Sequence, residues 1–223
     1  MLFHSLLAPG GSAYLNQLRV DIDGLDAERF KAAWRAVLER HEVLRTGFVQ
    51  GEGAWQWVAR QVEVPLAEHD WRGRADAPEA LDALAGEQLA QGFDLARPPL
   101  MRLVLVRVRD DRYHFVWTMH HLLLDGWSTS QLMGEVLRHY AGEAPAAPGG
   151  RYADYIAWLQ GRDGAADERH WRQELARLDG PTWLANTLPK PAVEQGGHGM
   201  HRHEIDAVSR EPASHFGLIF RNA

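Results

Sequence analysis

Residues 113–128 read YHFVWTMHHLLLDGWS and decide which kind of fold this chain can adopt. Residues 113–121 are strongly apolar and predict a β-strand, which two adjacent histidines close. An aspartate and a glycine follow, and residues 127–140 then place apolar side chains three and four positions apart, which predicts an amphipathic helix. A buried strand that leads into such a helix is typical of a layered α/β or α+β structure.

The two histidines, His120 and His121, cannot share one role. Successive side chains of a strand point to opposite faces of the sheet, so we expect one imidazole to be buried under the sheet and the other to face a cleft. Imidazole titrates near neutrality, which makes a histidine at a strand end a candidate general base. Asp125 would orient that histidine or brace the turn. A purely structural pair and a metal site of two histidines and one carboxylate are the alternatives.

The rest of the chain continues the mixture of strands and helices. Gly24 ends one predicted strand, Asp26 can cap the helix that follows, and Pro78 can open another. By default we assign the tryptophans at 34, 55, 57 and 117 to the core. The predicted strands are 14–23, 44–50, 55–64, 100–108, 113–121 and 200–206, and the predicted helices are 26–41, 78–91, 127–140, 152–160 and 165–178.

Composition limits the function classes. The chain has 223 residues, 45% of them hydrophobic, with a formal net charge of −6 and no cysteine. These values exclude disulfides, thiolate metal sites and a cysteine nucleophile, and they give no electrostatic footprint for nucleic acid. No stretch reaches 18 consecutive apolar residues and no secretory signal opens the chain, so we expect a cytoplasmic protein with no membrane partner.

Short motifs along the chain add to the histidine pair. His120-His121-x-x-x-Asp125-Gly126 has the pattern HHxxxDG, residues 40–48 (RHEVLRTGF) have the pattern RHxxLRTxF, and residues 152–158 (YADYIAW) have the pattern YxDYxxW. In this order, together with residues 1–6 (MLFHSL) and 170–178, they resemble the condensation domains of non-ribosomal peptide synthetases. Those domains belong to the wider superfamily of chloramphenicol-acetyltransferase-like acyltransferases, and the resemblance extends to about residue 206.

The resemblance implies an amide-bond-forming reaction between aminoacyl or peptidyl thioesters on peptidyl or aminoacyl carrier proteins. His121 would be the catalytic residue that takes a proton from the attacking amine or holds the amine and the tetrahedral intermediate. His120 would be its buried partner, and Asp125 would form a structural ion pair with Arg45. Gly126 would let the thioester approach, with its N–H facing the developing oxyanion. No cofactor and no metal would bind directly, because the phosphopantetheine of the carrier proteins holds the substrates.

The same resemblance implies a domain of about twice this length with two similar lobes. Residues 1–206 would form a chloramphenicol-acetyltransferase-like N-terminal lobe, an α/β sandwich with a mixed sheet. Residues 207–223 would be an atypical tail, because Pro212 falls where the family has a helix. The second lobe or other synthetase modules would then be partners. The alternatives are a non-catalytic truncated remnant that at most binds carrier proteins, and a free-standing CoA-dependent acyltransferase.

The histidines at 198, 201 and 203 are a separate candidate for a metal site. His201 and His203 would share one face of the strand predicted at 200–206. No nearby acidic residue completes a ligand set, so we predict no metal here.

Overall fold

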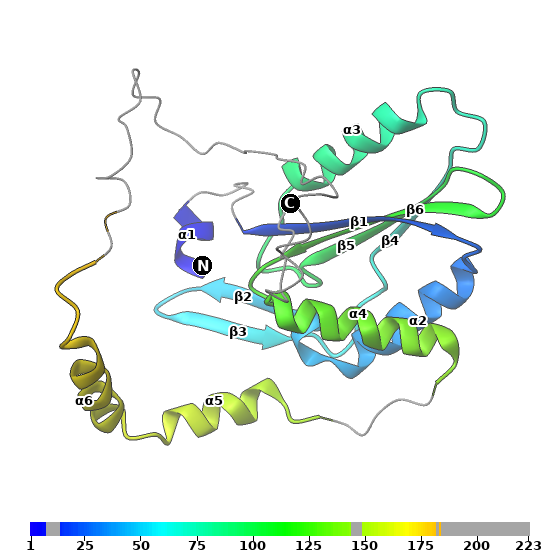
Figure 1. Ribbon diagram of the computed structural model, residues 1–223. Coiled ribbons are helices and arrows are strands. Elements are labelled where there is room, and N and C mark those ends of the chain that lie inside the picture. Colours follow the sequence, from blue (N-terminus) through cyan, green and yellow to red (C-terminus); the bar gives the residue numbers. More distant parts are fainter. Residues whose placement is uncertain (8–13, 144–148, 182, 184–223) are drawn as a thin grey trace, which may run out of the picture. The chain divides into compact units, whose positions relative to one another are not determined.

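The computed structural model describes residues 1–7, 14–143, 149–181 and 183 (Figure 1). These residues form two compact units, of which the first ends at Tyr155 and the second begins at Ile156. The first unit holds helix α1 (Leu2–Leu7) and all the strands described below. Helix α5 (Tyr152–Gln160) spans the boundary, and helix α6 (Gly164–Leu175) belongs to the second unit.

A mixed sheet of four strands forms the centre of the first unit. Its order is β1 (Leu15–Asp23), β6 (Arg112–His120), β5 (Met101–Arg107) and β4 (Leu66–Asp70). Strands β1 and β5 pair antiparallel with β6, while β4 pairs parallel with β5. The apolar stretch at 113–121 thus becomes a central strand, and its side chains from His114 to His120 are all buried because both sheet faces are covered.

Helices cover both faces of this sheet (Figure 1). Helices α2 (Ala27–Arg40) and α4 (Gly126–Ala141) lie side by side on one face. Helix α3 (Ala77–Ala90) covers the other face, where an apolar cluster that includes Val104 and Val116 packs against its Leu81 and Leu84. These layers confirm the predicted α/β sandwich with a mixed sheet and flanking helices.

Helix α2 shows why the sequence folds this way locally. The side chain of Asp26 accepts a hydrogen bond from Arg29 N at 3.0 Å and caps the first turn, as predicted. The apolar positions of the helix then face the sheet, where Trp34 and Trp117 are both 0% exposed. Their rings meet edge to face with centroids 5.0 Å apart. The buried residues of α2 are Phe30, Ala33, Trp34, Val37 and Leu38.

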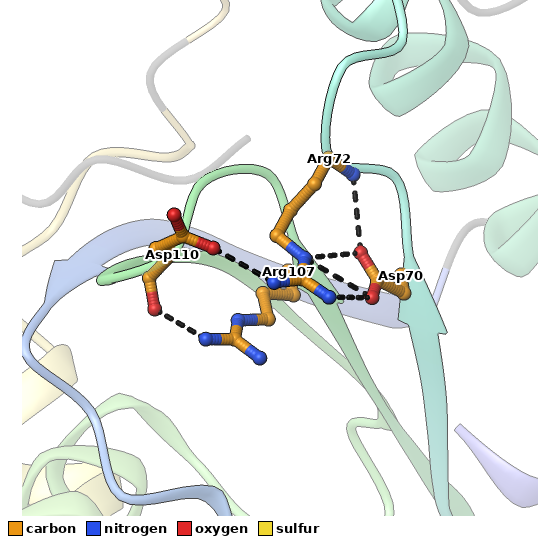
Figure 2. Close-up of polar contacts among 4 residues, drawn as sticks. All are labelled: Asp70, Arg72, Arg107 and Asp110. Atoms are coloured by element: carbon orange, nitrogen blue, oxygen red, sulfur yellow. Dashed lines mark hydrogen bonds and ion pairs between the residues drawn. The ribbon is translucent and has the colours of Figure 1, made fainter.

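The parallel edge strand β4 was not predicted. Its sequence, LAEHD, has no alternating apolar pattern, and most of its residues are exposed. Figure 2 shows a polar network at the end of β4: Arg72 bonds Asp70 through both carboxylate oxygens and also bonds Asp110, while Arg107 donates to the Asp110 carbonyl oxygen. Arg72 holds the pKa of Asp70 at about 2. The network joins β4 to the turn between β5 and β6.

The predicted hairpin forms from β2 (Thr46–Gln50) and β3 (Ala54–Val58), preceded by a short 3-10 turn at Glu42–Arg45. Its second strand ends at Val58, earlier than the predicted end at residue 64. The assignment of Trp55 and Trp57 to the core is wrong, because Trp55 is 66% exposed and Trp57 is also exposed. The hairpin is a separate two-stranded sheet and pairs with no other strand in the described part of the chain.

The last helices agree with the predicted ones, except that α6 ends at Leu175 and not at residue 178. The strand predicted at 200–206, the tail at 207–223 and the histidines at 198, 201 and 203 lie outside the described residues. Within the ranges that the structure describes, no helix combines the length and the apolar character needed to cross a bilayer.

Candidate active site

His120 is the last residue of β6, and His121 follows it directly. Both therefore lie at the end of the sheet, between the neighbouring strands β1 and β5. His120 N donates to Leu100 O at 3.0 Å, and His121 N donates to Tyr14 O at 2.8 Å. The main chain of both histidines is therefore fixed by residues that lie just before the flanking strands. The two imidazole side chains, in contrast, have different surroundings.

His120 is buried, with 4% of its surface exposed, and its ring is fixed on both sides. Leu122 N donates to its Nδ1 at 3.1 Å, so a neutral ring carries its proton on Nε2, which lies 3.3 Å from Ser5 Oγ of α1. Burial, aided by the neighbouring charge of His121, lowers the pKa of His120 to about 4. His120 is therefore a neutral structural residue at pH 7.

The low pKa of His120 predicts acid sensitivity. Its folded value of about 4 lies below its ordinary 6.5, so the unfolded chain binds more protons between these pH values. Its contribution to stability is complete above pH 6.5 and is lost as the pH falls towards 4, by up to about 3 kcal/mol. Urea unfolding from pH 7.5 to 4.5, compared with His120→Gln, measures this loss. Equal pH slopes in the two proteins would refute the assignment.

His121 is only half-buried, and this difference from His120 agrees with the expected division of the pair between two environments. Its Nδ1 lies 2.9 Å from Asn16 Nδ2 of β1. In the described part of the chain, Nε2 of His121 has no hydrogen-bond partner. Nδ1 of His121 is thus hydrogen-bonded to the protein, and Nε2 is available to a bound group.

Asp125 and Gly126 start helix α4. Asp125 has extended backbone and accepts a hydrogen bond from Ser128 N at 2.8 Å, so it is the N-cap of the helix. Hydrogen bonds from the backbone and side chain of Ser128 lower the pKa of the Asp125 carboxyl, with a smaller contribution from His121. Gly126 is the first residue of the helix, where a backbone N–H has no acceptor within the helix.

The cap gives a direct stability prediction. Asp125→Ala removes the acceptor for the first turn of α4 and should lower the free energy of unfolding by about 1 kcal/mol. Asp125→Ser supplies another capping oxygen and should recover most of this loss, as measured by urea unfolding at pH 7. An alanine variant as stable as the serine variant would show that the cap is unimportant.

The predicted ion pair between Arg45 and Asp125 is not formed. The guanidinium of Arg45 instead satisfies carbonyl oxygens at the end of α2 and after β3, and Asp125 is already engaged as a helix cap. Main-chain carbonyls at a helix end lack partners within the helix, which explains why a multidentate donor is used here. The acceptors of Arg45 are Leu38 O at 3.0 Å, Glu39 O at 3.3 Å, Arg60 O at 3.1 Å, and Ala59 O.

The half-buried ion pair of this region involves Arg40 and a residue that sequence reasoning missed, Glu135 of α4. Arg40 Nε lies 2.8 Å from one carboxylate oxygen of Glu135, and His41 Nε2 lies 2.7 Å from the other. The contact ties the end of α2 to α4. Glu135 is the only acidic residue between 127 and 140, and this isolated acid in an amphipathic helix is the sequence feature that could have identified it.

No group of three or more histidine, cysteine, aspartate or glutamate side chains within the described ranges is arranged to hold a metal ion. His120, His121 and Asp125 each engage protein groups, as described above. The donor set of a metal site with two histidines and one carboxylate is therefore not assembled here.

Comparisons with known proteins agree with this architecture. The Condensation domain family matches residues 1–209. The chain is 39% identical over 231 residues to a linear gramicidin synthase of Brevibacillus parabrevis, covering 99% of this chain and 4% of that protein. It is 35% identical over 224 residues to chondramide synthase cmdD of Chondromyces crocatus, covering 95% of this chain and 6% of that protein.

Solved structures show the same fold. The starter condensation domain of rhizomide synthetase RzmA superposes with a TM-score of 0.70 at 23% identity, covering 80% of this chain and 46% of that one. The NRPS cyclization-docking bidomain of EpoB from Sorangium cellulosum gives a TM-score of 0.66 at 26% identity, covering 75% of this chain and 35% of that one. The chain spans less than half of each solved structure and a small part of each curated relative. It belongs to the condensation-domain family of the non-ribosomal peptide synthetases.

Proposed function

We propose that this chain supplies the N-terminal half of a condensation site that joins two carrier-bound substrates through an amide bond. The amine of a downstream aminoacyl thioester attacks the carbonyl carbon of an upstream acyl thioester. The C–N bond forms, the C–S bond breaks, and the phosphopantetheine sulfur leaves with a proton. The chain itself binds no cofactor, because both substrates arrive on carrier proteins.

One observation carries the proposal: His121 is held at the end of the sheet with Nδ1 engaged by Asn16 and Nε2 without a protein partner in the described residues. A side chain that is fixed at one nitrogen and available at the other is suited to meeting a reacting amine or carbonyl. Family membership supports the same role, because this histidine is the second of the HHxxxDG pattern.

The other residues of the pattern have supporting roles in this proposal. His120 is a neutral, buried histidine that fixes the end of the strand against α1. Asp125 caps α4, and Gly126 presents a backbone N–H in the first turn, where a developing oxyanion can accept it. His121 either accepts the ammonium proton or holds the amine and the tetrahedral intermediate.

Residues 1–206 form the N-terminal lobe in this proposal, and a second lobe completes the site. Much of the rate then comes from holding two tethered reactants in line, since a positioned acid or base alone contributes about 100- to 10,000-fold. Peptidyl or aminoacyl carrier proteins are the partners that bring the reactants to the site.

The test is reconstitution. This chain is co-expressed with the segment that follows the matched region in the linear gramicidin synthase described above, and the purified pair is mixed with loaded donor and acceptor carrier proteins. Mass spectrometry of the acceptor should show the donor acyl group attached through an amide. Stable association of the two segments without product in any carrier pairing would contradict the proposal and favour a non-catalytic remnant.

A parallel reaction replaces the loaded donor carrier with acetyl-CoA and omits the carrier proteins, leaving a free amine as the acceptor. The proposal expects no acylation in this reaction. Acylation from CoA without a carrier would instead favour a free-standing CoA-dependent acyltransferase.

A further inference from the structure

Within the described residues, the side chain of Asn16 forms a hydrogen bond with the ring of His121. In the register of β1 and β6, Asn16 lies opposite Met119, so Asn16 and His121 are diagonal neighbours on one face of the sheet. Asn16 Nδ2 lies 2.9 Å from His121 Nδ1, and Tyr14 O accepts the His121 backbone N–H. The start of β1 therefore holds both the main chain and the ring of His121.

This contact has a chemical consequence for His121. An amide nitrogen only donates, so the hydrogen bond from Asn16 Nδ2 makes Nδ1 of His121 an acceptor. A neutral imidazole has one N–H, and the proton must then be on Nε2. His120 has the same tautomer because Leu122 N donates to its Nδ1. In this tautomer the available nitrogen, Nε2 of His121, is a hydrogen-bond donor and not a lone pair.

We propose that Asn16 is a positioning residue that keeps the proton of His121 on Nε2, so that His121 donates a hydrogen bond to the thioester carbonyl oxygen. This inference rests on the proposed function and decides between the two roles given there for His121. The neutral amine attacks the carbonyl carbon, and the negative charge that develops on the oxygen is stabilised by Nε2–H. When the C–S bond breaks, the amine proton passes to the leaving sulfur.

A general-base role would need the opposite arrangement. Nδ1 would carry the proton and donate to Asn16 Oδ1, which requires a half-turn of the Asn16 amide and frees the Nε2 lone pair. The charged or titratable groups around His121 do not enforce this turn. His120 is a neutral ring, and the Asp125 carboxylate is engaged by Ser128. The tautomer therefore depends on Asn16.

Asn16→Asp is the matched variant, because it keeps the size of the side chain and removes its donor. An aspartate can only accept, so it should move the proton of neutral His121 to Nδ1 and raise the pKa of the ring. Nitrogen-15 NMR of the chain labelled at histidine shows directly which ring nitrogen carries the proton. The His121→Gln variant identifies the signal of this residue. The wild type should show a protonated Nε2 and an unprotonated Nδ1. A protonated Nδ1 in the wild type would overturn the proposal.

The rate of the reconstituted reaction gives the second readout. Asn16→Asp should lower the rate at least about 100-fold, since one oxyanion donor is lost. Asn16→Ala, which leaves the tautomer free, should cost about tenfold. A rate at or above wild type in Asn16→Asp, with a new fall in rate as His121 is protonated, would identify a general base and refute the donor role. The NMR measurement needs no partner, so it stands even where the wild type forms no product.

Discussion

Replacement of His121 by alanine is expected to lower the condensation rate of the reconstituted site between about 100- and 10,000-fold. The loss has this size whether the ring accepts a proton or donates to the oxyanion. Because His121 is only half-buried and makes a single side-chain hydrogen bond in the described residues, the variant should still fold. Single-turnover transfer from a loaded donor carrier to a loaded acceptor carrier measures the rate.

The matched control is His69→Ala, which removes an imidazole from the exposed face of β4. It should leave both the rate and the unfolding midpoint unchanged. His121→Ala that retains more than about a tenth of the wild-type rate would show that this histidine has no chemical role.

The second large effect is on stability. Trp34→Ala should lower the free energy of unfolding by about 3–5 kcal/mol, because it opens a cavity where α2 meets the sheet. Trp34 is fully buried, and its ring contacts those of Phe30, Phe115 and Trp117. Urea unfolding followed by circular dichroism gives the value. A domain of this size has only about 5–15 kcal/mol in total, so the variant should be close to unfolding at 37 °C.

Trp55→Ala makes the same chemical change on the exposed face of the β2–β3 hairpin. The structure predicts a change within about 0.5 kcal/mol for this variant. Similar losses for the two variants would mean that the assignment of core and surface is incorrect.

The elements with strong periodicity were predictable from sequence. Helix α2 has a capping aspartate and a continuous apolar stripe, and β6 is apolar enough to require cover on both faces. Strand β4 has neither signal, and its place in the sheet is set by its parallel pairing with β5, which the sequence of β4 alone does not show. Trp55 and Trp57 were misplaced because residue type alone does not show whether another layer covers a hairpin.

The site was predictable to a similar extent. Alternation along a strand was enough to predict that His120 and His121 meet different environments. The partner of Arg45 was not predictable, because carbonyl acceptors belong to the backbone and leave no mark in the sequence. Asn16 was missed for another reason: its contact with His121 depends on the register between β1 and β6, over 105 residues of separation.

The most direct test of the central claim is the mass of the acceptor carrier protein after reaction with the reconstituted site. If this chain supplies His121 to a condensation site, the acceptor gains the mass of the donor acyl group with the wild type and shows a strongly reduced gain with His121→Ala. An unchanged acceptor mass with the folded, associated wild-type pair, across all carrier pairings, would contradict it.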